Sequence, residues 1–504
     1  METQDRSAKD IYDKAIETRS QYVDRAEEIS SLTIPYLMPP KGYSSSSSLD
    51  DSLKQSDMAT NINSLTSKIT MTLFPTASSS FRLDPSADNM EALSQEGAEE
   101  IKQQVYTELS ATTSRINTEI ERQDIRPQVF GFIRDTIAVG PVIIEKVPEK
   151  GIKWHGLASI GVMLDDRFEP YEMAILEVLT TLPEGVTVKD EKDEYEVYTA
   201  IVKDKESDKW IVTQSIGTEV QPDEQTYTDE TLPFQYIGWA IAKGDTFHRP
   251  YTEQHMGNIR SYNALAQVLT DGAVIASKSL IFVDPRGGRT KMRTVANSAN
   301  GDILEGRADD VTSFQLNKNF DFQVPMERMN NLKESLEKAY LVNSSAVRQS
   351  ERTTLGEITY TAQDLETQLA GIYSIMAEKV NKRVVMWIMQ DLGIKLGDSQ
   401  MSIITGLDSL SLRTEAQKLD AFMQTVSALG YSSSIKESEV VQRYAGYHGI
   451  NTLGLIKTQA EMQQEAQAAQ QQQMMMAGGD ALAKSAGEGA GQAMTQPQEG
   501  EPNG

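Results

Sequence analysis

The chain has 504 residues, of which 39% are apolar and 24% charged, so it is neither collagen-like, nor wholly disordered, nor a disulfide-stapled miniprotein. Its net charge of −25 argues against a general nucleic-acid-coating role, because most of the surface repels polyanions. The absence of cysteine excludes disulfides, thiolate zinc sites and cysteine nucleophiles, and favours a reducing compartment. No stretch has the apolar core of a signal peptide or the roughly 20 apolar residues of a membrane span, so we expect neither export nor membrane insertion.

The first third of the chain carries helical patterns. Apolar residues at three-, four- and seven-residue intervals predict an amphipathic helix over residues 7–32 that stops at Pro35. Similar patterns predict helices over residues 62–73 and 99–133, the second interrupted at Pro127. A serine-rich run at residues 43–48, between the predicted helices of residues 7–32 and 62–73, predicts a polar loop.

The composition shifts at Gly140 to short β-branched or aromatic runs separated by turn residues. These runs predict an antiparallel meander with strands at residues 142–144, 172–180, 195–202, 209–214 and 234–241. Its acidic loops, such as residues 190–194, are interpreted as solvated turns because no metal-ligand spacing accompanies them.

A pair of long helices follows the meander. Residues 260–280 carry an apolar stripe that includes Leu265 and Leu269, and residues 325–341 carry one that includes Leu332 and Leu336. Between them lie short strand candidates at residues 302–304, 311–316 and 320–324. The pattern predicts a helix pair that carries a small β cap.

The remainder of the chain is predicted to be mostly helical. Residues 343–356 form a polar loop, residues 357–392 a long helix closed by Gly393, and residues 412–429 and 438–447 further helices. Residues 477–504 are rich in glycine and poor in large apolar residues, so we expect them to be disordered.

Motifs of catalysis are missing. The four histidines are scattered without zinc-site spacing, and the chain has no phosphate-binding, dinucleotide-binding or serine-hydrolase motif. Asp165 and Asp166 could supply half of a two-metal site, but adjacent residues of a strand face opposite sides, so a turn is favoured. We therefore expect no cofactor and no metal.

Two basic sets stand out against the acidic background. Arg286, Arg289, Lys291 and Arg293 lie in a stretch without an acidic residue, and a solvated cap and a binding patch are equally open interpretations. Arg348 and Arg352 form a smaller set in the polar loop of residues 343–356.

Four segments together carry a family resemblance: residues 32–39, 65–75, 249–265 and 343–358. In their order and spacing, with the helix–β–helix unit among them, the chain resembles the portal, or head-to-tail connector, proteins of short-tailed double-stranded-DNA bacteriophages. Two positions depart from the family pattern: His248 replaces a glycine, and Leu355-Gly356 replaces Ala-Glu.

The resemblance implies an α+β, mainly helical portal subunit that assembles into a ring, usually of twelve, at one capsid vertex and is not an enzyme. It implies a wing (1–258 and 357–406), stem helices (259–285 and 325–342), a clip (286–324), a tunnel loop (343–356), a crown (407–476) and a disordered tail (477–504). The implied partners are the terminase motor, the tail adaptor and nozzle proteins, the major capsid protein, scaffold or internal core proteins, and DNA in transit, with no membrane. The implied locations are the virion and, during assembly, the host cytoplasm.

The same resemblance implies roles for the singled-out residues. Arg348 and Arg352 would face DNA from the tunnel loop, the four basic clip residues would face the motor or adaptor, and the four stem leucines would pack the stem. The acidic composition agrees with a conduit, because an acidic wall lets DNA slide without sticking.

Two alternatives from other classes stay open on the residues alone. One is a hydrolase of nucleic acid or polysaccharide that uses acidic residues such as Asp165, Asp166, Asp190 and Asp193. The other is a helical scaffold or adaptor with coiled-coil contacts through the glutamine-rich end.

Overall fold

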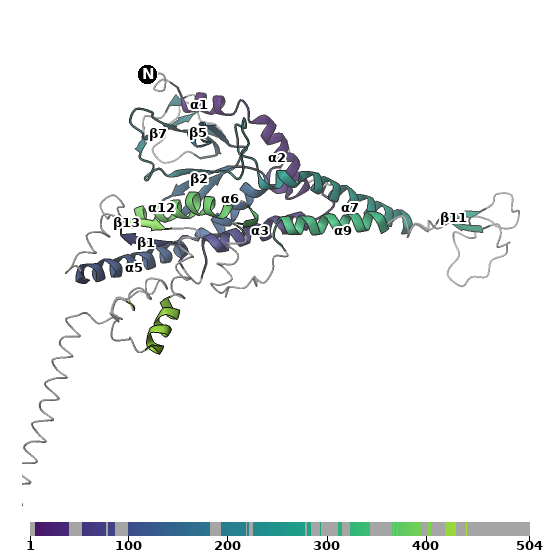
Figure 1. Ribbon diagram of the computed structural model, residues 1–504. Helices are drawn as coiled ribbons and strands as arrows, with labels where there is room; N and C mark the ends of the chain where they lie inside the picture. The colour runs from purple at the N-terminus through teal and green to yellow at the C-terminus, as the bar shows by residue number, and fades with distance from the viewer. Residues whose placement is uncertain are drawn as a thin grey trace, which may run out of the picture. The chain divides into compact units, whose positions relative to one another are not determined.

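The computed structural model describes residues 6–39, 53–76, 79–85, 99–181, 193–217, 219–220, 225–277, 280–283, 293, 311–314, 323–342, 365, 367–369, 371–394, 401–404, 419–429 and 440. The chain divides into two compact units, one of residues 1–82, 116–399 and 403–411 and the other of residues 83–115, 400–402 and 412–504. The described residues contain α-helices and four separate sheets, so the prediction of a mixed helix and sheet fold is confirmed (Figure 1).

The N-terminal segment forms two helices where one was predicted, α1 (Ala8–Ala15) and α2 (Ser20–Leu32). Ser7 begins α1 with a capping box, in which its hydroxyl accepts from the Asp10 amide and the Asp10 carboxylate accepts from the Ser7 amide. A 3-10 turn, η1 (Pro35–Leu37), follows α2, and α3 (Asp57–Leu73) matches the next predicted helix with an earlier start.

The predicted helix of residues 99–133 is also two helices, α5 (Glu99–Arg122) and α6 (Ile125–Ala138). The break lies at Asp124, whose φ of 50° is left-handed, and not at Pro127. Pro127 sits in the first turn of α6, where its missing N–H has no helical acceptor to lose.

The predicted meander is divided between two antiparallel sheets. The first has the order β10-β2-β3 and contains β2 (Val142–Val147), β3 (Gly151–His155) and β10 (Phe234–Ile237). The second has six strands: β4 (Ile160–Leu164), β5 (Pro170–Leu179), β6 (Tyr195–Lys203), β7 (Trp210–Ile216), β8 (Glu219–Val220) and β9 (Gln225–Tyr227). Four strands of these sheets were not predicted from the sequence: β3 and β4, which are five residues long, and β8 and β9, which are two and three residues long.

Each of these two sheets has a helix packed against it, and buried apolar side chains fill the space between them. Helix α1 covers the six-stranded sheet, where Ile11 and Tyr12 pack against Ala174, Tyr198 and Ala200 (Figure 1). Helix α6 packs against α3 and the three-stranded sheet through fully buried side chains such as Phe132 and Ile133.

The predicted helix pair is present as α7 (Met256–Ser277), which follows the 3-10 turn η2 (Tyr251–His255), and α9 (Gln323–Ala339). The predicted first helix ran too far, because Leu280–Val283 forms the strand β11, paired antiparallel with β12 (Val311–Phe314). The run Leu-Ile-Phe-Val has the β-branched and aromatic character of a strand. The strand candidate at residues 302–304 lies outside the described residues, as do residues 320–322 of the candidate at 320–324. The remainder of that candidate is wrong, because residues 323–324 are the first two residues of helix α9.

The predicted long helix of residues 357–392 is not a single helix, because Gly371, with a left-handed φ of 84°, precedes α11 (Ile372–Met376). Residues 365, 367 and 368 before it are helical, and α11 continues through the π-helical turn η4 (Ala377–Lys382) into α12 (Arg383–Asp391). Gly393, with a φ of 70°, follows the helix end as predicted. Two short strands, β1 (Arg82–Pro85) and β13 (Met401–Ile404), pair with each other, and residues 419–428 are helical. The predicted helix at residues 438–447 (save residue 440) and the tail of residues 477–504 fall on parts of the chain that the structure does not describe.

Within the described residues, none of the helices combines the length and apolar character needed to cross a lipid bilayer.

Candidate functional site

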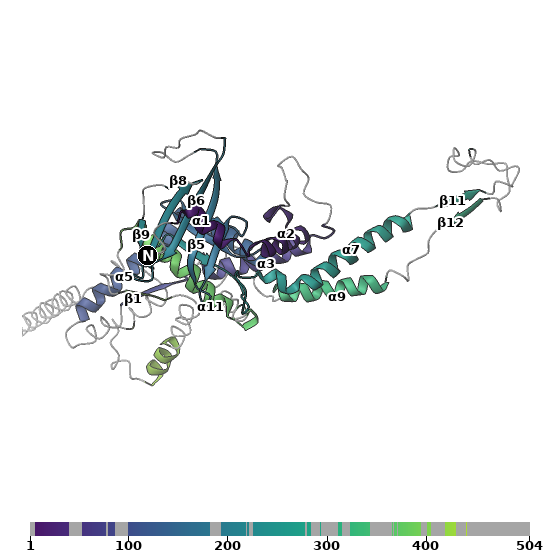
Figure 2. The same cartoon turned by 90° about the horizontal axis from the view of Figure 1, so that it is seen from above.

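The helix pair α7–α9 is the candidate site, and its two helices run side by side (Figures 1 and 2). Leu332 and Leu336 of α9 are buried, whereas Leu265 and Leu269 of α7 are half-buried. The predicted apolar stripes therefore lie on the helix pair at positions at least partly shielded from solvent.

A second set of apolar side chains on the same helices is exposed in the single chain. The exposed fractions are 53% for Val268 and 52% for Val274 on α7, and 72% for Val324 and 52% for Met326 on α9. Four of the large apolar residues that are exposed in the described part of the chain therefore lie on these two helices.

Charge on the two helices is balanced. Helix α7 carries only Arg260 and Asp271, and the three glutamates of α9 are matched by three basic residues, Arg328, Lys333 and Lys338. The acidic excess of the chain therefore lies outside these helices, and the expectation of an acidic wall does not hold for them.

Buried hydrogen bonds fix the root of the helix pair. The hydroxyl of Tyr340, which is fully buried, donates to Thr252 Oγ1 at 3.0 Å, and Thr252 donates to the Ile137 carbonyl at 2.8 Å. Tyr251 donates to the Ala339 carbonyl at 2.7 Å, and burial raises its pKa to about 12, so it stays a donor. The end of α9 is thereby tied to η2 and α6.

Asp57, at the start of α3, joins both helices of the pair. Its carboxylate accepts from the Tyr262 hydroxyl on α7 and from Lys333 Nζ on α9, the latter at 3.1 Å. Burial acts to raise the pKa of Asp57, but these two hydrogen bonds outweigh it and the pKa is lowered. The carboxylate is therefore charged and holds α3, α7 and α9 together.

Arg249, just before η2, forms a third set of bonds at the root of the helix pair. Arg249 binds Asp245 with two nitrogens at 2.7 Å each and Glu253 at 2.8 Å, and Glu253 also accepts from Arg25 of α2 at 3.1 Å. The hydrogen bonds from Arg249 hold the pKa of Asp245 at about 2. The network connects α2 to the root of the helix pair.

His248, which replaces the glycine of the family pattern, is accommodated by another glycine. Its ring is buried and bonds the Tyr236 hydroxyl through Nδ1 at 3.1 Å. A Cβ at Gly238 would lie 2.2 Å from the His248 ring, so only glycine leaves room there. His248 and Gly238 therefore fit together directly before Arg249.

Acidification should weaken the fold through His248. Burial lowers its pKa from 6.5 to about 4, so between these values the unfolded chain binds a proton that the native chain does not. The contribution is complete above pH 6.5 and is lost as the pH falls towards 4, in total about 3 kcal/mol of unfolding free energy. Urea unfolding at pH 7, 5 and 4 should show a shallower pH dependence for His248→Gln, which cannot titrate; equal slopes would contradict this account.

Most of the predicted basic residues cannot be placed. Arg293 is an exposed residue in helical conformation, whereas Arg286, Arg289, Lys291, Arg348 and Arg352 lie outside the described residues. Their predicted roles stay predictions.

The acidic residues of the hydrolase alternative do not form a site in the described residues. Asp165 lies in the turn between β4 and β5, where its Oδ1 accepts from the amides of Arg167 and Glu169 at 2.8 and 2.9 Å. Asp166 and Asp193 are exposed, and Asp190 is outside the described residues. The turn interpretation is confirmed.

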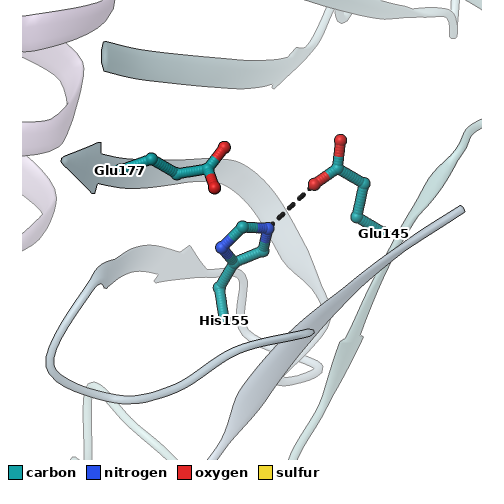
Figure 3. A group of neighbouring side chains, drawn as sticks. All are labelled: Glu145, His155 and Glu177. Carbon is teal, nitrogen blue, oxygen red and sulfur yellow. Dashed lines mark hydrogen bonds and ion pairs between the residues drawn. The ribbon is translucent and has the colours of Figure 1, made fainter. Parts of the chain in front are cut away.

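The sequence analysis did not single out one group of ionisable side chains, Glu145, His155 and Glu177, which converge from three strands (Figure 3). Glu145 and His155 belong to neighbouring strands of a hairpin, and Glu177 belongs to the other sheet. No spacing along the chain signals such a group; only the pairing of the strands does.

Known proteins are similar to this chain over most of its length. The family model for the bacteriophage head to tail connecting protein matches residues 5–158 and 178–452. The portal proteins of Escherichia phage T7 and Enterobacteria phage T3 are each 27% identical, covering 97% and 95% of this chain and 95% of each relative. The portal protein of Enterobacteria phage SP6 is 25% identical over 90% of both chains.

Solved structures give a weaker likeness. A chain from the neck of a native gene transfer agent particle with C12 symmetry covers 62% of this chain and 78% of its own length, at 11% identity and a TM-score of 0.31, which is too low to carry an argument. The family match, in contrast, spans most of the sequence. The chain therefore belongs to the bacteriophage head-to-tail connecting protein family.

Proposed function

We propose that this chain is the repeating subunit of a portal ring, the conduit through which double-stranded DNA enters and leaves the capsid at its head-to-tail vertex. Membership of the connector family and the three portal proteins matched over at least 90% of their length support this role. Connectors of this kind are structural proteins and not enzymes, which agrees with the absence of catalytic motifs in the sequence.

The observation that carries the proposal is the apolar surface of α7 and α9. Val268, Val324 and Met326 are each more than half exposed in the single chain, although the helices that carry them are anchored at their root. A closed ring covers them, because each subunit presents its helix pair to the next one. The balanced charge of the helices also allows them to stand side by side without mutual repulsion.

The regional roles belong to the same proposal. Helices α7 and α9 are the stem, residues 343–356 the tunnel loop and residues 407–476 the crown. The clip was expected over residues 286–324, but residues 323–324 belong to α9, so the clip ends before α9 begins. Arg286, Arg289, Lys291 and Arg293 of the clip face the terminase motor and later the tail adaptor and nozzle proteins, through attraction that salt screens. Arg348 and Arg352 make transient phosphate contacts with passing DNA.

The remaining partners follow from the location. The ring contacts the major capsid protein and scaffold or internal core proteins while the head assembles in the host cytoplasm, and it remains at the portal vertex of the virion.

Imaging of the purified protein tests the proposal. We expect negative-stain images to show rings with a central hole, and mass photometry to give about twelve times the 55.9 kDa of one chain. A filament would support the scaffold alternative, and a monomer at micromolar concentration would contradict the ring.

A further inference from the structure

Three side chains that the portal role does not use meet between the two sheets. Glu145 lies on β2, His155 on β3 and Glu177 on β5, and one ligand atom of each lies within 4.8 Å of the other two. Figure 3 shows the two carboxylates turned towards the imidazole, with His155 Nε2 at 2.9 Å from Glu145 Oε2. Among the described residues, Glu145, His155 and Glu177 are the His, Asp or Glu side chains whose possible ligand atoms come this close in a set of three.

The separations suit a tetrahedral ion after a small movement. A zinc-class ion holds its ligands at about 2.0–2.2 Å, which places ligand atoms roughly 3.3 Å from one another. The 2.9 Å pair has to open by a few tenths of an ångström, and the wider pairs have to close by at most about 1.5 Å. Rotation of the two glutamate side chains supplies both changes without moving the strands.

The donor set points to the chemical class of the ion. Imidazole nitrogen favours first-row transition metals over Mg²⁺ and Ca²⁺, which prefer oxygen alone. Two carboxylates neutralise the charge of a divalent ion, and one imidazole and two carboxylates leave a fourth position for water. We propose that Glu145, His155 and Glu177 bind one zinc-class divalent cation that joins the three-stranded sheet to the six-stranded sheet.

The surroundings favour retention of such an ion. The His155 side chain is 5% exposed, and those of Glu145 and Glu177 are 27% and 22% exposed, so bulk water has limited access while one water can still reach the ion. A buried imidazole also loses little further freedom on binding because the strands already hold it.

Lys153 is the competitor for this position. Its ammonium forms an ion pair with Glu177 and neutralises that carboxylate in the ion-free chain. The lysine side chain is 46% exposed, so it can withdraw into solvent when a divalent ion arrives. Replacing Lys153 with a neutral residue should therefore strengthen ion binding.

The site depends on a segment that the family model does not match. Residues 159–177 fall between the two matched ranges, and Glu177 is the last residue of that gap. The inference thus goes beyond the portal function and concerns a feature of this chain.

Isothermal titration of the untagged full-length protein with ZnCl₂, and visible spectroscopy with CoCl₂, test the site. We expect one ion per subunit and a cobalt spectrum typical of tetrahedral coordination. Glu177→Gln and Glu145→Gln should each weaken binding at least about tenfold, and Lys153→Gln should strengthen it. The matched control is Glu169→Gln, which removes another glutamate–lysine pair, with Lys379, away from the site and should leave binding unchanged.

Equal zinc binding by wild type and both glutamine variants, or the absence of saturable binding, would overturn the inference. His155→Gln supplies a further ligand deletion, but its buried position makes folding less certain to survive, so the half-buried glutamates carry the test. Ring formation is measured separately by mass photometry, which keeps failure of the metal site distinct from failure of the portal proposal.

Discussion

Replacement of Val268 with aspartate is expected to abolish ring formation while the subunit itself stays folded. Val268 is 53% exposed in the single chain, so the new carboxylate remains hydrated there and costs the subunit about 0.5 kcal/mol or less. In the proposed ring the same carboxylate would be buried against the next subunit without a partner, at a cost of several kcal/mol at every interface. Mass photometry should show monomers, and circular dichroism should show unchanged helix content.

Val268→Thr is the matched control, because threonine has the shape of valine without a charge. We expect this variant to form the ring, and the ring to dissociate at a higher protein concentration than that of the wild type. Leu336→Ala is the opposite case: Leu336 is buried within its own chain, so its loss should destabilise the subunit by about 2–5 kcal/mol. Intact rings of Val268→Asp would show that Val268 does not face a neighbouring subunit.

Replacement of Tyr340 with alanine should destabilise the root of the helix pair by about 3–5 kcal/mol, the cost of removing a large buried aromatic side chain. The ring of Tyr340 is fully buried and contacts Tyr251 at a centroid distance of 5.4 Å. Its hydroxyl is one link in the hydrogen-bonded chain to Thr252 and Ile137. Urea unfolding followed by tryptophan fluorescence should report the loss, because Trp239 also packs against Tyr251.

Tyr340→Phe separates the hydroxyl from the ring. It removes one hydrogen bond and keeps the packing, so we expect a loss of about 1 kcal/mol. If alanine and phenylalanine cost the same, the hydroxyl bond and not the packing would dominate, and the account of the root given above would be wrong.

The sequence predicted those elements whose signal is local. The apolar stripes of α3, α7 and α9 reflect one helix face each, and they could be read without knowledge of the partner that covers them. The break at Asp124 could not be predicted, because it depends on a left-handed residue and leaves the apolar pattern unchanged. Strand β11 was assigned to the preceding helix because an apolar run of four residues fits both structures until its partner β12 is known.

The candidate site, the helix pair α7–α9, could likewise be predicted only where its signal is local. The leucines of the helix pair were found from their spacing, whereas Asp57, Thr252 and Tyr340 were missed because their partners lie far away in the sequence. Gly238 and His248 are a further example, since the space that one provides for the other appears only once both are placed. Packing partners distant along the chain leave no periodic trace in a single sequence.

The π-helical turn Ala377–Lys382 has a consequence for insertions and deletions. It accommodates one residue more than an α-helix would, and each residue turns the helix by about 100°, so α12 is rotated relative to α11 by that angle. Both sides of the turn are held in place: Ile372, Tyr373 and Met376 of α11 are buried. Asn381 in the turn donates to the Leu73 carbonyl and to Ser80 Oγ, and Trp387 of α12 donates to the Leu232 carbonyl. Deletion of a single residue there would keep the helix continuous and yet rotate Trp387 away from the Leu232 carbonyl. The number of residues in this segment is therefore constrained by the direction in which the side chains of α12 point, and not by the distance that the segment has to span.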